Sequence, residues 1–229
     1  MKKIDQPAKA PRVVWRKEEH TLTLQDEPVL TYCLVWPELE RAGLGGRWIN
    51  RYYVHLAKSW RLRWQRDVYW QACIELAQCR AASRVFTPWS GKLEGEVALW
   101  QDGLLSLRLR GEETRGDGRP NRVQWGDVWK VREGAPCQLK ELVPKNRGWK
   151  RKIVEQIAAF GAARRAEGTC FLDGDWEGEL AKHLPIHDFC LTEQGAELAF
   201  GQCVIAPAVE GNPVFCVATQ LQHNTAASG

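Results

Sequence analysis

Residues 93–110, LEGEVALWQDGLLSLRLR, hold two alternating runs on either side of Asp102-Gly103. An Asp-Gly pair favours a type I′ hairpin turn, because both central residues of that turn need a positive φ. In the second run, leucines alternate with a serine and two arginines, so one face is apolar and the other polar. The stretch therefore predicts an antiparallel β-hairpin with one buried and one solvated face.

A long amphipathic helix is expected before this hairpin. Apolar side chains recur at steps of three and four residues, beginning with Ile49, Tyr53, Leu56, Trp60 and Trp64. This spacing places them on one stripe of a helix over about 48–82, with arginines on the outer side. The same periodicity predicts a second, medium-length helix over about 148–166.

The remaining ordered segments are short alternating runs separated by Gly, Pro and Asp, which is typical of strands and turns. Because helices and strands are segregated, the expected fold class is α+β, with antiparallel sheets on which the long and the medium helix pack. We expect a flexible segment at 1–12, one domain over 13–221 and a flexible tail at 222–229. Two subdomains that share a core, 13–92 and 93–221, are the alternative division.

Composition narrows the class of protein. The 229 residues carry 32 Lys+Arg and 28 Asp+Glu, a net charge of +4 that does not by itself indicate a nucleic-acid or membrane partner. No segment resembles a signal peptide or a membrane span, so the chain as written is expected to be cytoplasmic. The eight cysteines lie mostly among apolar neighbours, which favours buried free thiols in a reducing compartment over disulfides.

Two segments imitate metal sites. Asp173, Asp175 and Gly178 match the start of an EF-hand loop, but Leu184 stands where that loop needs its bidentate glutamate. We therefore expect these acids to precede and cap a short helix.

The second segment holds His183, His187 and Cys190, and Pro185 breaks the helix that could have aligned the two imidazoles. No metal and no cofactor is predicted.

No nucleophile elbow, phosphate-binding loop or zinc-protease motif occurs, so no catalytic residue is predicted and the sequence gives no positive reason to propose an enzyme. The basic helix 48–82 could bind nucleic acid, with Trp60, Trp64 and Trp70 stacking on bases beside Arg61, Arg63 and Arg66. Trp60 and Trp64 lie on the core stripe, however, so packing is the favoured role and a nucleic-acid partner is not expected.

The C-terminal part of the sequence carries a family resemblance. Residues 189–200, FCLTEQGAELAF, are followed by Ile205-Ala206-Pro207 and then by GNPVF at 211–215. This order resembles the signature of the RsiV-like domain-of-unknown-function family, in which Phe-Tyr-Leu-Thr, a glycine-led apolar run and Ile-Ala-Pro follow one another. Earlier segments fit in the same order, including 49–57, 102–107, 126–129 and 134–136, so the resemblance covers about residues 20–221.

The resemblance implies a non-catalytic α+β recognition or accessory domain. Such domains form the extracellular part of lysozyme-sensing bacterial anti-sigma factors and occur beside peptidoglycan deacetylase domains, so relatives are largely extracellular and linked to the cell envelope. This chain departs from the family pattern at 114–120, TRGDGRP, and at Ala208-Val209.

Recognition by such a domain is expected at loops on a rigid scaffold. The candidate loops are 111–120, interpreted as a mobile turn, and 206–213, and the predicted ligand-binding residues are Thr114, Arg115, Asp117, Arg119, Ala206, Pro207, Gly211 and Asn212. The expected partner is a protein or a cell-envelope glycan. A cell-wall glycan or peptide hydrolase with unidentified carboxylates and a cytosolic nucleic-acid binder are the alternatives.

Overall fold

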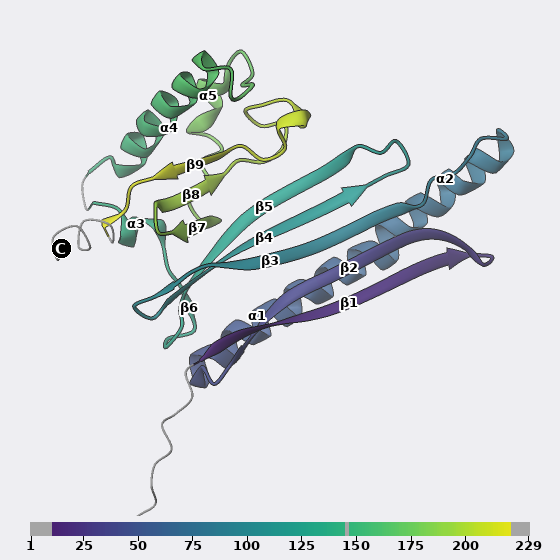
Figure 1. The fold of residues 1–229 in the computed structure, drawn as a ribbon, viewed down its shortest axis with the longest axis horizontal. Coiled ribbons are helices and arrows are strands. Elements are labelled where there is room, and N and C mark those ends of the chain that lie inside the picture. The colour runs from purple at the N-terminus through teal and green to yellow at the C-terminus, as the bar shows by residue number, and fades with distance from the viewer. Residues whose placement is uncertain (1–10, 145–146, 221–229) are drawn as a thin grey trace, which may run out of the picture.

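The computed structural model describes residues 11–144 and 147–220, and a long twisted sheet spans most of its length (Figure 1). This sheet has six strands in sequence order: β1 (Arg12–Leu24), β2 (Glu27–Glu40), β3 (Trp89–Gln101), β4 (Leu104–Thr114), β5 (Pro120–Lys130) and β6 (Ala135–Pro136). Neighbouring strands are antiparallel except β2 and β3. These two run parallel because the long helix between them returns the chain to the starting end of β2.

The predicted hairpin is confirmed. Strands β3 and β4 pair from Ser90 and Thr114 to the turn, where Asp102 and Gly103 have φ values of 51° and 78°. The α+β fold class is also confirmed, with nine strands in two sheets. The parallel β2–β3 pair is the one departure from the expected antiparallel sheets in the part of the chain that the structure describes.

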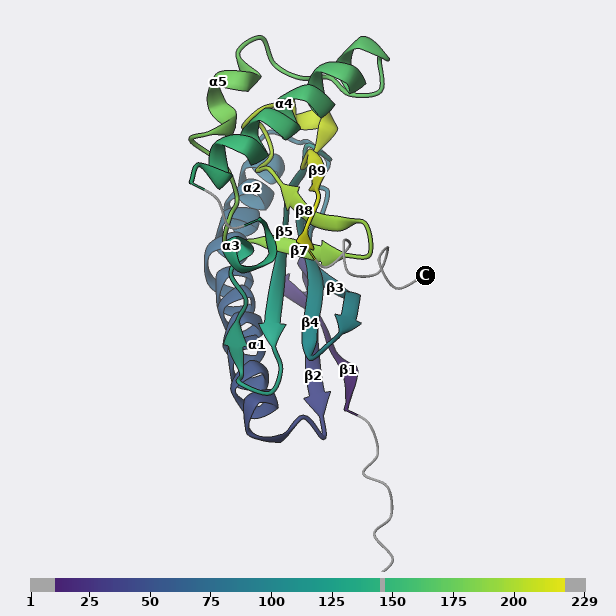
Figure 2. The ribbon, with the colours of Figure 1, turned by 90° about the vertical axis from the view of Figure 1, so that its left-hand side faces the viewer.

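The long helix is confirmed and is continuous over 39 residues. It consists of α1 (Gly43–Arg63), a π-helical turn η1 (Trp64–Val68) and α2 (Tyr69–Ala81), and it follows one face of the larger sheet (Figure 2). It begins before the predicted residue 48 because the glycines at its start pack closely. A Cβ on Gly45 would lie 2.1 Å from the carbonyl oxygen of Val131, so the absence of a side chain lets the helix approach the turn after β5.

The helix packs its apolar stripe on the sheet, as the periodicity predicted. Trp64 is fully buried, and Ile49 and Tyr53 are fully buried against the leucines of β4. Glycines in the strands make room for the indoles: a Cβ on Gly91 would lie 2.7 Å from the ring of Trp64. The exposed tryptophans of the helix are Trp48 and Trp70.

One acid lies on the helix-covered face of β5. Tyr53 Oη donates a hydrogen bond to Asp127 Oδ2 over 2.8 Å, and Trp129 Nε1 donates to Tyr53 Oη over 2.8 Å. Burial, with a smaller contribution from the charge of Asp188, raises the pKa of Asp127 to about 6. The helix and the sheet are thus joined through a carboxylate whose ionisation the surroundings oppose.

A smaller layer lies over the end of the larger sheet where β5 leads into β6. Its sheet contains β7 (Phe189–Thr192), β8 (Gly195–Ala199) and β9 (Val214–Val217), all antiparallel. Helices α3 (Leu139–Leu142), α4 (Trp149–Ala166) and α5 (Trp176–Leu180) and the 3₁₀ turn η2 (Ala208–Glu210) complete it. The predicted helix over 148–166 is confirmed as α4, which buries Ile153 and Ile157 against this sheet.

The two sheets touch through backbone. The amide of Gly126 in β5 donates to the carbonyl of Asp188 over 3.0 Å. A Cβ on Gly126 would lie 2.4 Å from the amide nitrogen of Cys190 and from the carbonyl of Phe189. Strand β7 therefore lies directly on β5, at a distance that only glycine allows.

Other expectations concern termini and cysteines. Residues 1–10 and 221–229 lie outside the described residues, so the flexible ends and the division into one or two units stay predictions. Arg12, the last residue of the predicted flexible segment 1–12, belongs to β1 instead. All eight cysteines are unpaired, and five are buried, as expected from their neighbours. None of the helices within 11–144 and 147–220 is long and apolar enough to cross a membrane.

Replacing Gly126 tests the contact between the sheets. The Gly126→Ala variant forces β7 away from β5, and we expect it to lower the free energy of unfolding by about 2–4 kcal/mol, the range of a disrupted core contact. Urea denaturation followed by circular dichroism measures this. Gly174→Ala is the matched control, since a Cβ there meets nothing within 4 Å, and an equal loss in both variants would contradict the proposed contact.

The pKa of Asp127 has a consequence for stability. An aspartate has an ordinary pKa of 3.8, so between about pH 4 and pH 6 the folded state binds more protons than the unfolded state. The free energy of unfolding therefore falls as the pH rises through this interval, by about 1–3 kcal/mol. We expect Asp127→Asn, which keeps an acceptor for Tyr53, to be more stable than the wild type at pH 7.5 but not at pH 4.

Urea denaturation at both pH values measures the difference. Asp173→Asn, the same change at an exposed acid, serves as the control. A stability difference for Asp127→Asn that is the same at both pH values would show that burial does not oppose the ionisation of this carboxyl.

Candidate functional site

The face of the larger sheet opposite the helix is polar and partly open. Because side chains alternate along a strand, the leucines at 105, 107 and 109 face the helix while their neighbours face the other way. The outward positions of β3, β4 and β5 carry Lys92, Glu94, Glu96, Arg108, Arg110, Glu112, Arg122 and Gln124. We call these eight residues the charged face.

Side chains of the charged face pair across the strands. Arg122 Nε lies 2.8 Å from Glu112 Oε2, and Arg110 Nε donates to Gln124 Oε1 over 3.0 Å. Ion pairs this exposed contribute little to stability. They do hold extended arginines in place, and each arginine can exchange its partner for a ligand carboxylate at small cost.

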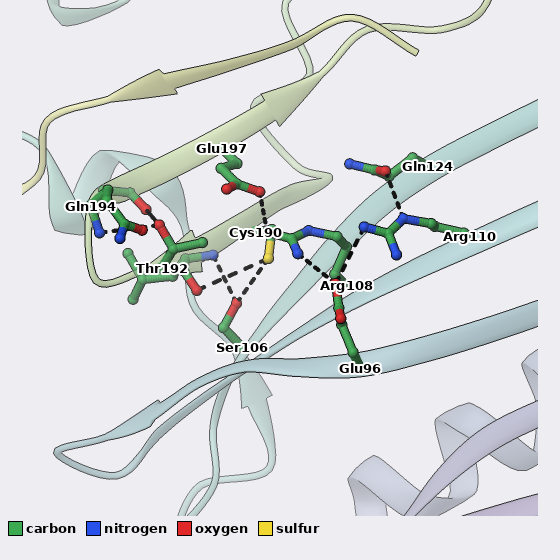
Figure 3. A network of polar contacts seen from close by, with 11 residues as sticks. Glu96, Ser106, Arg108, Arg110, Gln124, Cys190, Thr192, Gln194 and Glu197 are labelled. Atoms are coloured by element: carbon green, nitrogen blue, oxygen red, sulfur yellow. Dashed lines mark hydrogen bonds and ion pairs between the residues drawn. The ribbon is translucent and has the colours of Figure 1, made fainter. Parts of the chain in front are cut away.

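Arg108 is the least exposed arginine of this face, with 17% of its side chain accessible (Figure 3). It bridges Glu96 of β3 and Glu197 of β8. Burial disfavours its charge, but the hydrogen bonds to both carboxylates outweigh burial and raise the pKa of Arg108 above its ordinary value. Arg108 therefore anchors the smaller sheet on the larger one.

Ser106 lies two residues before Arg108, on the same face of β4, and it anchors β7 (Figure 3). It is fully buried, its Oγ accepts a hydrogen bond from the amide of Leu191 over 2.7 Å, and it lies 3.5 Å from Cys190 Sγ. The smaller sheet thus covers Ser106 and Arg108 and leaves the outward positions from Arg110 onward uncovered.

A groove of about 310 Å³ occupies the uncovered part. Its floor consists of outward side chains of β3, β4 and β5, and its wall is the segment 210–212, which begins at the last residue of η2. Gln202 fixes this wall: its Nε2 donates to the carbonyls of Pro120 and Ala208, and its Oε1 accepts from the amide of Arg122. One amide side chain therefore connects the two regions in which binding residues were predicted.

The first predicted region, 111–120, differs from the expectation in its secondary structure. Interpreting 111–120 as a mobile loop is wrong, because residues 111–114 belong to β4 and Pro120 to β5, which leaves a turn at 115–119. One polar residue of the stretch, Glu113, misleads here because the helix covers it. Glu113, only 4% exposed, accepts hydrogen bonds from Arg63 Nε over 2.6 Å and from Trp64 Nε1 over 3.0 Å.

The predicted residues of this region lie at the end of the hairpin. Thr114 pairs with Pro120, and the Arg115 guanidinium lies 5.2 Å from the ring centre of Trp89. Asp117 Oδ1 accepts a hydrogen bond from the amide of Arg119 over 3.0 Å. Arg115 thus reaches toward the helix side of the sheet, and none of the four lines the groove.

The second predicted region, 206–213, contributes two residues to the lining of the groove. Gly211 and Asn212 line the groove, and a Cβ on Gly211 would lie 3.7 Å from Cδ of Arg122. Asn212 also supports the wall, since its Nδ2 donates to the carbonyl of Phe200. Ala206 is fully buried and Pro207 is exposed.

Sequence reasoning missed the floor of the groove. Lys92, Glu94, Glu112 and Arg122 were not among the predicted residues. The available signal was the alternation of charged and apolar residues in the hairpin, which identified a wet face but not which part of it the smaller sheet would leave uncovered.

The imitated metal sites do not assemble. His183 pairs with Glu179 over 3.2 Å, while Cys190 lies buried against Ser106. Asp175 directly precedes α5, where it makes no side-chain capping bond. Within the described ranges, no group of three or more His, Cys, Asp and Glu side chains is placed to hold a metal ion.

The residues of the long helix that were considered for nucleic-acid binding lie in different surroundings. Arg61 pairs with Glu18 and Arg63 with Glu113, so two of the three arginines considered for phosphate binding already have carboxylate partners. Trp64 is fully buried and Trp60 stacks on Trp125 at 6.3 Å. Trp70 is exposed, as stacking on a base would need.

Comparing two arginines of one strand tests the anchoring role of Arg108. We expect Arg108→Met to lower the free energy of unfolding by about 1–3 kcal/mol, because it leaves Glu197 partly buried without its partner. Arg110→Met, at a side chain 46% accessible, should cost less than about 0.5 kcal/mol. Urea denaturation measures both, and similar losses would argue against an anchor at Arg108.

Comparisons with known proteins bear on the fold. No family model and no curated protein matches the chain. The crystal structure of a DUF3298 family member from Bacteroides fragilis is similar with a TM-score of 0.66 and 13% identity, over 92% of this chain and 91% of that one. A DUF3298 family protein from Pseudomonas aeruginosa gives a TM-score of 0.55 at 13% identity, over 96% and 94%.

DUF3298 is the designation of the RsiV-like domain, so these structures have the fold that the sequence resemblance implied. At 13% identity the likeness concerns the fold alone and carries no ligand or activity with it. The chain thus shares the fold of two DUF3298 family proteins.

Proposed function

We propose that this chain is a non-catalytic binding domain that recognises a protein or a cell-envelope glycan through the charged face. The observation that supports this most is the groove, where a rigid sheet floor meets the wall 210–212. The fold and the sequence resemblance agree with an accessory domain of the RsiV-like type, and lysozyme is therefore the first partner to test.

The chemistry of the groove favours a protein over a glycan. Its floor mixes Lys92, Arg110 and Arg122 with Glu94 and Glu112, which complements a folded surface with charges of both signs. Sugar rings bind best on flat aromatic side chains, and the described residues that line the groove include no aromatic ring. A uniform polyanion such as nucleic acid would be repelled by the three glutamates that line the groove, Glu94, Glu112 and Glu210.

The compartment belongs to the same proposal. Eight unpaired cysteines, five of them buried, support a reducing environment for this chain, whereas the relatives that the resemblance points to are largely extracellular.

Retention on two immobilised probes, lysozyme and insoluble peptidoglycan, tests the proposed function. We expect the wild type to be retained on lysozyme, and Arg122→Glu to weaken retention at least tenfold because it places a negative charge beside Glu112 in the groove. Arg151→Glu on α4 is the matched control, at a side chain 81% accessible and outside the groove, and should bind as the wild type does.

Three outcomes would redirect the proposal. Loss of binding only when 115–119 is replaced by Gly and Ser would move the site to the hairpin turn. Retention on neither probe would remove the lysozyme and peptidoglycan forms of the proposal. Release of soluble fragments from peptidoglycan, dependent on a single Asp or Glu, would favour the hydrolase.

A further inference from the structure

A second cavity, of about 410 Å³, opens at the edge of the larger sheet. It lies between α1, β5 and the segment that leads into β7, and it shares no lining residue with the groove. The side chains that give it chemical character are Tyr52, Asp127, Trp129, Gln138, His187 and Asp188. None of them belongs to the charged face.

Two aromatic rings form a fixed wall of this cavity. The rings of Tyr52 and Trp129 contact each other edge to face, with centroids 5.2 Å apart and planes at 64°. Trp129 is 7% exposed and its indole N–H is used by Tyr53, so the ring cannot turn to offer a donor. Tyr52 remains 41% exposed at the opening.

Two carboxylates lie beside these rings. Asp127 is held by Tyr53 Oη, and Asp188 comes next to it because its carbonyl accepts the amide of Gly126, the residue before Asp127. The negative charges of both carboxylates reach Tyr52. Burial is the main cause that raises the pKa of Tyr52 to about 12, and Asp127 and Asp188 add to it. Among the described residues that line the cavity there is no lysine or arginine to neutralise them.

We propose that this cavity binds an organic cation, the alkylammonium group of a small amine or of a lysine side chain. The carboxylates supply charge and hydrogen-bond acceptors, and Tyr52, 41% exposed beside Trp129, supplies the aromatic surface that ammonium groups favour. A neutral sugar could contact the rings but would gain nothing from the charge of the two carboxylates. A metal ion is a poorer fit, because no metal-holding group of three ligands occurs in the described ranges.

Asp127 supports this inference independently of the cavity's shape. Its ionised form is disfavoured inside the protein, and a carboxylate kept at such a position is typical of functional sites. An ammonium group beside Asp127 and Asp188 would favour the ionised form and so relieve the cost. Ligand binding should therefore stabilise the fold as well as occupy the cavity.

NMR titration of the ¹⁵N-labelled full chain with n-butylammonium chloride tests the proposal, with n-butanol as a neutral probe of similar shape. The indole N–H of Trp129, assigned with a Trp129→Phe variant, reports on the cavity. We expect a saturable shift of this signal with the amine and none with the alcohol. Asp127→Asn and Asp188→Asn should each weaken amine binding at least tenfold, while Asp173→Asn, a matched change at an exposed acid, leaves it unchanged.

Equal shifts with amine and alcohol, or unchanged amine affinity in both variants, would overturn the proposal. A response to calcium chloride or to chitotriose in place of the amine would overturn it as well. Should Asp127→Asn fail to fold, which the spectrum shows directly, the exposed Asp188 decides the outcome. Because Arg122→Glu lies outside this cavity, failure of the groove and failure of the cavity are separate results.

Discussion

The arrangement of the two sheets depends on the close contact between the backbone of β7 and Gly126 of β5. The smaller sheet shares one core cluster with Val128 of β5, so burying its apolar residues against the larger sheet stabilises this arrangement. At Gly126 the absence of a Cβ permits the approach, and the amide of Gly126 and the hydroxyl of Ser106 fix the register by bonding Asp188 and Leu191. That register decides which outward side chains are covered and which remain open as the groove.

Two acids on the helix-covered face of the sheet have surroundings that make them opposite in character. Glu113 is buried, but the hydrogen bonds and charge of Arg63 outweigh burial and lower the pKa of its carboxyl. Asp127 has tyrosine and tryptophan neighbours and a second acid nearby, so burial dominates and its pKa rises to about 6. The long helix therefore supplies the cation of Arg63 to Glu113 but only the hydroxyl of Tyr53 to Asp127. For this reason Glu113 links the helix to the sheet, whereas Asp127 is a candidate for binding a ligand.

Periodicity predicted much of the fold and less of the site. The hairpin at Asp102-Gly103, the long helix and α4 follow from local spacing, because turns and amphipathic stripes are encoded within a few residues. The helix begins at Gly43, before the predicted residue 48, and Gly45 lies within it as a point of close packing. The groove depends on which strands β7 covers, and the cavity on residues 52, 127 and 188 meeting. These are long-range contacts that no local pattern contains. One local signal was available: Asp127 lies between Trp125 and Trp129, at a position that alternation along the strand places on the core-facing side.

Side-chain parity in β5 links the two proposed sites. Residues 122, 124 and 126 face the groove and the smaller sheet, while 125, 127 and 129 face the helix. A shift of one residue in the pairing of β4 and β5 would place Asp127 against Phe189 and turn Gly126 toward Tyr53. The carboxylate would then meet the backbone of β7, and the groove would lose the guanidinium of Arg122. The bulky Trp125 and Trp129, which fit only on the helix side, oppose this shift, so the tryptophans that packing requires also determine where the charged residues lie.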